Sequence, residues 1–227
     1  MREVLDGKIE RLRNVECGVR NDFLNYINFI LKTQNKNLLF PVFIKLESLH
    51  SLLVGGGNVG LEKLSAILAN SPEATVTVVA DRFLEELREL VKNYPKVTLI
   101  ERKFEFNDLN DKDLVFLATD NPTLHESIKR ETSERRILCN VADTPDLCDF
   151  YLGSIVQKGD LKIAISTNGK SPTMAKRMRE FLDDIIPDDV QQLLENLREI
   201  RKSIKGDFQE KIRVLNEVTE SLINKKP

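Results

Sequence analysis

The chain has 227 residues, of which 41% are hydrophobic and 31% are charged, and its formal charge is −2. This is the composition of a globular protein with one large domain, or with one domain and a smaller appendage. The balanced charge gives no global attraction to nucleic acid or to an anionic membrane, so neither is predicted as a partner. No apolar run approaches the roughly 18 residues of a membrane-spanning helix, and residues 1–18 lack the apolar core of a signal peptide.

The cysteines Cys17, Cys139 and Cys148 are odd in number and widely spaced. This predicts a reducing compartment, and hence a cytoplasmic location, without a disulfide framework. No Cys-x-x-Cys pair is present, which argues against structural zinc, and the sequence predicts no metal ligands.

Apolar residues at helical spacing predict a helical extension over residues 1–37, packed on the main body or on a second subunit. From residue 38 to 142, short apolar runs typical of strands alternate with helical segments at about 58–70, 82–93 and 122–134. The runs are LLFPVFIKL, SLLVG, ATVTVVA, KVTLI, DLVFLAT and RILCNVA. This alternation predicts an α/β domain, a Rossmann-like doubly wound parallel sheet covered on both faces.

Residues 143–186 do not continue the alternation of strands and helices. Two strands are predicted here, around a turn at residues 158–160. Ser171 and Pro172 are the expected N-cap and first residue of a helix. Residues 187–227 carry apolar positions at helical spacing on both sides of Gly206, which predicts a C-terminal helical domain.

Gly55, Gly57 and Gly60 form a G-x-G-x-x-G set between a predicted strand and a predicted helix. In a dinucleotide site the first glycine permits the tight turn, the second lets the backbone approach the pyrophosphate, and the third lets helix and strand pack closely. The helix start at Asn58 and Val59 offers free N–H groups to the phosphates. The loop lacks the Gly-Lys-Ser/Thr of a triphosphate site.

Acidic and polar residues lie at the ends of three of the predicted strands. Asp81 either contacts the adenosine ribose, which favours NAD over NADP, or is the N-cap of the next helix. Thr119 and Asp120 either contact the nicotinamide or its ribose, or only end a strand and cap a helix. Asp143 either acts as a proton acceptor at the carboxyl edge of the sheet or only bonds backbone N–H groups in a turn.

Five segments in order over roughly residues 40–187 suggest a family: FPVFIKL, VGGGNVGLEK, FLATDNPTLHESI, CNVADTPDLCDFYLGSIV and LKIAISTNGKSPTMAKRMREFL. Together they resemble the precorrin-2 dehydrogenase/sirohydrochlorin ferrochelatase family, the NAD-dependent part of siroheme synthase. The resemblance implies that NAD takes a hydride from precorrin-2 to give sirohydrochlorin. In bifunctional members, ferrous iron is then inserted to give siroheme. It further implies a homodimer formed through residues 143–186, with Asp143 as the catalytic aspartate.

A tetrapyrrole with eight carboxylates needs cations and hydrogen-bond donors. The segment STNGKSP offers Ser166, Thr167, Asn168, Lys170 and Ser171, which are the predicted substrate-binding residues. Arg177 and Arg179 are weaker candidates because charges on a helix usually form its solvated face. Asp146 is expected in a turn, and Asp149 is expected to bond to the backbone.

The only histidines, His50 and His125, exclude a histidine-rich chelatase site. His125 is expected to be a surface or capping residue, and Cys148 is expected to pack inside. The fused siroheme synthases carry a methyltransferase domain that this sequence lacks, so another protein is expected to supply precorrin-2. Two other hypotheses remain, an NAD-sensing regulatory module without activity and an unrelated Rossmann oxidoreductase.

Overall fold

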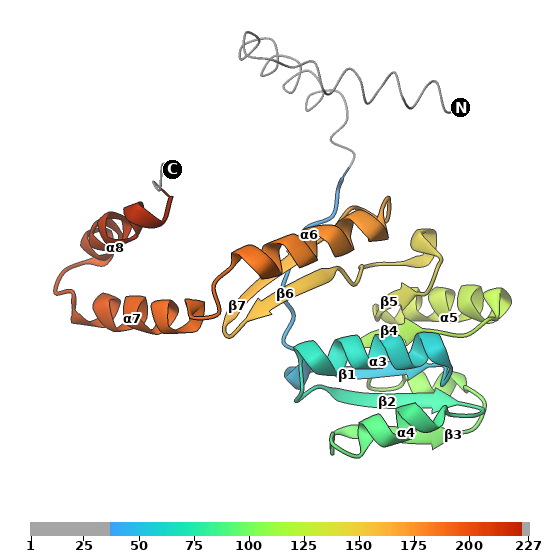
Figure 1. The fold of residues 1–227 in the computed structure, drawn as a ribbon. Coiled ribbons are helices and arrows are strands. Elements are labelled where there is room, and N and C mark those ends of the chain that lie inside the picture. Colours follow the sequence, from blue (N-terminus) through green and yellow to red (C-terminus); the bar gives the residue numbers. More distant parts are fainter. Residues whose placement is uncertain (1–36, 224–227) are drawn as a thin grey trace, which may run out of the picture. The chain divides into compact units, whose positions relative to one another are not determined.

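The computed structural model describes residues 37–223, with side chains as far as residue 220 (Figure 1). The chain divides into two units, residues 1–42 and 43–227, and every element given below lies in the second. The helical extension predicted for residues 1–37 and Cys17 lie outside the described residues, apart from Asn37. No described helix is long and apolar enough to cross a membrane.

Five parallel strands form the central sheet in the order β3-β2-β1-β4-β5. They are β1 (His50–Val54), β2 (Thr75–Ala80), β3 (Val97–Glu101), β4 (Leu114–Leu117) and β5 (Leu138–Val141). Leu53 of β1 lies opposite Val78 of β2 on one side and Phe116 of β4 on the other. The predicted doubly wound parallel sheet is therefore confirmed, and its strand order reverses beside β1, which is where such sheets bind ligands.

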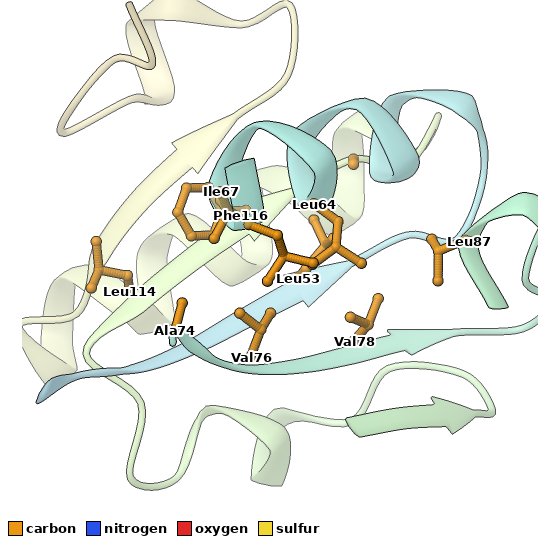
Figure 2. Packing of buried hydrophobic residues seen from close by; sticks show 11 residues of the cluster. Leu53, Leu64, Ile67, Ala74, Val76, Val78, Leu87, Leu114 and Phe116 are labelled. Carbon is orange, nitrogen blue, oxygen red and sulfur yellow. The ribbon is translucent and has the colours of Figure 1, made fainter. Parts of the chain in front are cut away.

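Helices cover both faces of this sheet. On one face, α3 (Asn58–Asn70) and α4 (Glu85–Val91) pack over a core that includes Leu53, Leu64 and Phe116 (Figure 2). On the other face, α5 (Pro122–Arg135) and the 3-10 helix η2 (Phe106–Leu109) pack over a second core. Successive residues of each strand point to opposite faces, so an apolar run such as Leu52-Leu53-Val54 supplies both cores.

Two predicted boundaries differ from the structure. Residues 38–45 of the predicted strand LLFPVFIKL have no strand assignment, and Leu46–Ser48 form the 3-10 helix η1. An apolar run becomes a strand only where its backbone pairs with another, and Pro41 has no N–H to donate. The helix predicted at about 82–93 is shorter, because residues 81–84 form an irregular connection before α4.

After the sheet, the 3-10 helix η3 (Pro145–Leu147) leads to an antiparallel hairpin of β6 (Ser154–Lys158) and β7 (Leu161–Ile165). Gly159 has the positive φ that this turn requires, +59°. The helix α6 (Pro172–Ile185) packs on the hairpin (Figure 1), with Ser171 as its N-cap as predicted. The chain continues as α7 (Val190–Ser203) and α8 (Phe208–Ile223), on either side of Gly206.

Candidate active site

A cavity of about 800 Å³ opens at the carboxyl ends of β1, β2 and β4. Its wall consists of residues 54–59, 79–82, 103–104, 118–121 and Leu124. Every predicted cofactor residue except Gly60 lies on this wall, which brings Gly55, Gly57, Asn58, Val59, Asp81, Thr119 and Asp120 together. We call this space the cofactor cavity.

The glycines of the loop are required for different reasons. Gly55 has a φ of +123°, and a Cβ there would lie 2.2 Å from the carbonyl oxygen of Ala118. A Cβ on Gly60 would lie 2.2 Å from the carbonyl oxygen of Gly55, so this glycine permits the close approach of α3 to β1. A Cβ on Gly57 would meet no atom within 4 Å. The open space beside the Gly57 backbone suits a pyrophosphate, and the free N–H groups at the start of α3 favour its negative charge.

Sequence reasoning missed several residues of the cofactor cavity. The G-x-G-x-x-G spacing predicts no role for Gly56, yet a Cβ there would lie 2.3 Å from the carbonyl oxygen of Arg82. Arg82 and Lys103 bring two cations to the cavity wall. The Gly-Gly-Gly run was the available signal for Gly56, whereas nothing in the sequence placed Lys103 near the loop.

Asp81 is exposed on the wall of the cofactor cavity and does not cap a helix. The N-cap of α4 is Leu84, three residues later, and it makes no side-chain capping bond. The N-cap alternative for Asp81 is therefore wrong, because the intervening turn separates this residue from the helix start. Contact with a ribose remains a prediction.

Neither Thr119 nor Asp120 is the N-cap of the helix that follows, α5. The N-cap of α5 is Asn121, whose Oδ1 accepts the Leu124 N–H at 3.0 Å. The Thr119 hydroxyl instead lies 2.8 Å from Nε2 of His125. The surface position expected for His125 is wrong, since the residue is only 5% exposed in α5. Burial lowers the pKa of His125, and the charge of Asp120 opposes this shift only in part.

A second cavity, of about 300 Å³, lies beside the end of β5. Asp143 is on its wall, together with the rest of residues 140–145 and with Val59, Glu62 and Lys63 of α3. Val59 lines this cavity as well as the cofactor cavity, so the two spaces adjoin. We call it the Asp143 cavity.

Asp143 has a left-handed backbone conformation, with a φ of +55°. The residue does lie in a turn, but its carboxylate accepts no hydrogen bond from any residue between 37 and 223. The side chain that bonds within this turn is Thr144, whose hydroxyl donates to the Ala142 carbonyl at 3.2 Å. The exposed Asp143 carboxylate is therefore free to meet a ligand, and its unusual φ is the kind of strain that gathers at functional sites.

A hydrogen-bond network that the sequence did not reveal holds Lys63 at the Asp143 cavity. Lys63 Nζ donates to Asn140 Oδ1 at 2.7 Å, and Asn140 Nδ2 donates to the Phe150 carbonyl at 2.8 Å. Burial lowers the pKa of Lys63, while the charges of Cys148, Glu62 and Asp143 act in the opposite direction. Cys148 is half-buried, and its Sγ lies 3.2 Å from the Val141 N–H.

The other two aspartates of this segment behave as expected. Asp146 lies in η3. Asp149 Oδ2 accepts the Cys139 N–H at 2.9 Å, and its Oδ1 pairs with Lys129. Asp149 thus ties the chain after β5 back to that strand.

The structure places the predicted substrate-binding loop at the start of α6, and only Gly169 of the loop lines the Asp143 cavity. Thr167 Oγ1 accepts the Ser171 N–H, and Ser171 Oγ accepts the Met174 N–H to cap the helix. Asn168 has a φ of +54°, and its N–H donates to Ser166 Oγ. Lys170 is exposed. Arg179 is also exposed, and Arg177 pairs with Glu180 on the solvated face of α6.

Residues 42–154 match the family described as putative NAD(P)-binding, and residues 158–184 match the central segment of sirohaem biosynthesis proteins. The chain is 35% identical over 168 residues to a siroheme synthase of Vesicomyosocius okutanii. It is 36% identical over 169 residues to one of Pseudoalteromonas atlantica. The chain is therefore related to the siroheme synthases through these two segments. Residues 42–154 are an NAD(P)-binding domain, the kind of domain that takes NAD as its cofactor.

The alignments cover 74% of this chain but only 35% and 36% of these two relatives, so the chain spans about a third of their length. Among solved structures, "SirC, precorrin-2 dehydrogenase" superposes with a TM-score of 0.64 at 23% sequence identity. That match covers 79% of this chain and 89% of the other. It shows that the two proteins share a fold.

Proposed function

We propose that this protein oxidises precorrin-2 to sirohydrochlorin in siroheme biosynthesis, with NAD as the hydride acceptor. The observation that carries the proposal is that Val59 lines both cavities. A nicotinamide ring at the mouth of the cofactor cavity would therefore lie next to a macrocycle edge in the Asp143 cavity. The names of the matched relatives and of the superposed dehydrogenase support the same reaction.

The residues around the cofactor cavity fit a dinucleotide. The pyrophosphate would lie against the Gly57 backbone and the N-terminus of α3, and the Asp81 carboxylate would accept hydrogen bonds from the ribose hydroxyls. A 2′-phosphate at that position would be repelled by Asp81, which favours NAD over NADP. When bound, NAD supplies the acceptor for the hydride that leaves the macrocycle.

In this mechanism the Asp143 carboxylate takes the proton that the macrocycle loses together with the hydride. The balance is one hydride to the cofactor and one proton to Asp143, which then releases it to solvent. Asp143 suits this role because it is exposed at the cavity and accepts no hydrogen bond from the described residues. The same carboxylate would take pyrrole N–H protons if ferrous iron is inserted afterwards.

The finer part of the proposal is a homodimer formed through residues 143–186. At about 300 Å³, the Asp143 cavity is at the lower end of ligand pockets, and a macrocycle with eight carboxylates would project beyond it. Met174, Phe181 and Ile185 share one face of α6 and are each more than half exposed. A second copy covering this face would bury them and extend the site.

The test is anaerobic incubation of the purified protein with precorrin-2 and NAD, following NADH absorbance and the tetrapyrrole spectrum. Asp143→Asn should retain NAD affinity and lose oxidation, because asparagine tolerates the positive φ of this position but does not act as the base. Asp146→Asn, three residues away and outside the cavity wall, is the matched control and should turn over normally.

Each alternative hypothesis gives a different result in this assay. NAD binding by the wild-type protein without turnover would support a sensor module and contradict the proposal. Unchanged turnover by Asp143→Asn would remove Asp143 from the mechanism. Ferrous or cobaltous ion added to sirohydrochlorin and wild-type protein tests chelation separately, through the spectrum of the metallated ring.

A further inference from the structure

Lys63 has no role in the reaction proposed above, although it lines the Asp143 cavity. It lies in the second turn of α3, and with Val59 and Glu62 it forms the face of this helix that lines the Asp143 cavity. The side chain is half-buried. The helix that presents its N-terminus to the cofactor cavity thus presents a lysine to the neighbouring cavity.

The buried side chain of Asn140 holds this ammonium in place. Asn140 is only 4% exposed, and its Nδ2 donates to the Phe150 carbonyl at 2.8 Å. Its Oδ1 must then face the other way, where it accepts from Lys63 Nζ at 2.7 Å. The orientation of the amide is therefore fixed by the backbone of the β5–β6 connection, and Lys63 is fixed by the amide.

The charge of Lys63 is uncompensated at close range. Within residues 37–223, Lys63 forms no ion pair, and Asn140 is its single hydrogen-bond partner, so two of its three N–H groups remain for a ligand. Cys148, Glu62 and Asp143 act on it through their charges, without a hydrogen bond or an ion pair to it. A partly desolvated cation without an anionic partner is unfavourable in the free protein, and it attracts an anion more strongly than a fully solvated lysine does.

We infer that Lys63 receives one carboxylate of the tetrapyrrole and thereby sets which edge of the macrocycle faces Asp143. The inference rests on the proposed function, which supplies a substrate with carboxylates around its rim. An ammonium on α3 and a carboxylate base beyond β5, both on the wall of one cavity, give two anchors of opposite sign. The ion pair with Lys63 would fix the register of the ring against Asp143 and against the cofactor beyond Val59.

The experiment compares Lys63→Met with Lys63→Arg, which removes or retains the charge on a stem of similar length. Binding of sirohydrochlorin without NAD, followed by absorbance titration, measures recognition apart from chemistry. Steady-state oxidation of precorrin-2 then gives KM and kcat, and the NAD titration shows that the fold is intact. Lys92→Met is the matched control, since Lys92 pairs with Glu89 on the surface of α4, away from both cavities.

We expect Lys63→Met to bind sirohydrochlorin roughly tenfold or more weakly, which is the weight of one charged hydrogen bond. Lys63→Arg should recover most of this loss, and NAD affinity should not change. The difference between wild type and Lys63→Met should also shrink at high salt, because it reflects an ion pair. If Lys63→Met does not fold, Lys63→Gln, which keeps an N–H donor for Asn140, replaces it in the same comparison.

Two results would overturn the inference. One is sirohydrochlorin binding by Lys63→Met equal to that of wild type. The other is a lower kcat with unchanged KM and unchanged sirohydrochlorin affinity, which would assign Lys63 to proton transfer. Neither depends on the proposed function failing, because that failure appears as absent turnover in the wild-type protein itself.

Discussion

Replacing Gly57 and Gly60 separately by alanine should have different effects. Gly60→Ala should lower the stability of the fold, and Gly57→Ala should weaken cofactor binding. At Gly60 the new Cβ would lie 2.2 Å from the Gly55 carbonyl oxygen, whereas an ordinary contact begins at 3.4 Å. Helix α3 would have to move away from β1 by about the difference, 1.2 Å, in a region where Leu64 and Leu68 are fully buried. Overpacking of this kind costs about 1–3 kcal/mol of the free energy of unfolding.

At Gly57 the expectation is the opposite. Its φ of −86° and ψ of −165° are open to any residue, and no atom lies within 4 Å of an added Cβ. Gly57→Ala should therefore leave stability unchanged or raise it by about 0.4–1 kcal/mol through the unfolded chain. The methyl group would instead occupy the space proposed for the pyrophosphate. A tenfold loss of NAD affinity corresponds to about 1.4 kcal/mol, and we expect at least that much.

Urea denaturation measures the first effect and calorimetric titration with NAD measures the second. The reasoning about Gly57 would be refuted if Gly57→Ala bound NAD within twofold of wild type. A Gly60→Ala protein as stable as wild type would refute the account of the close approach between helix and strand.

Three further predictions concern stability. Leu53→Ala, in the middle of the sheet and fully buried, should lower the free energy of unfolding by about 2–5 kcal/mol in urea denaturation, and a loss under 1 kcal/mol would contradict the proposed core. Asp149→Ala should lose about 1–3 kcal/mol, because the Cys139 N–H and Lys129 both lose their partner, and an unchanged midpoint would show that these bonds do not matter. Burial lowers the pKa of His125 from 6.5. Just below pH 6.5 the imidazole is therefore protonated more fully in the unfolded chain than in the folded one. Stability should therefore fall as the pH drops through 6.5, and His125→Asn should flatten this dependence; an equally steep curve for the variant would contradict it.

The cofactor half of the site could be predicted from sequence because its signal is local. A G-x-G-x-x-G set between a strand and a helix fixes which backbone groups face the ligand, and the structure confirms the strand-loop-helix unit at Gly55 and Gly57. Asp143 could be selected because it follows an apolar strand and lies within a family motif. The parallel sheet and the hairpin of β6 and β7 followed from alternating patterns in the same local way.

The amino-acid sequence by itself thus determined the α/β architecture, the dinucleotide loop and the turn that carries Asp143, since each depends on neighbours in the chain. Only the tertiary structure decided that Lys63 and Asn140, 77 residues apart, share a hydrogen bond. It also decided that residues 38–45 form no strand and that His125 is buried beside the Thr119 hydroxyl. These features depend on which distant groups come into contact, and the sequence around an apolar run or a single lysine does not indicate which distant residue it will contact.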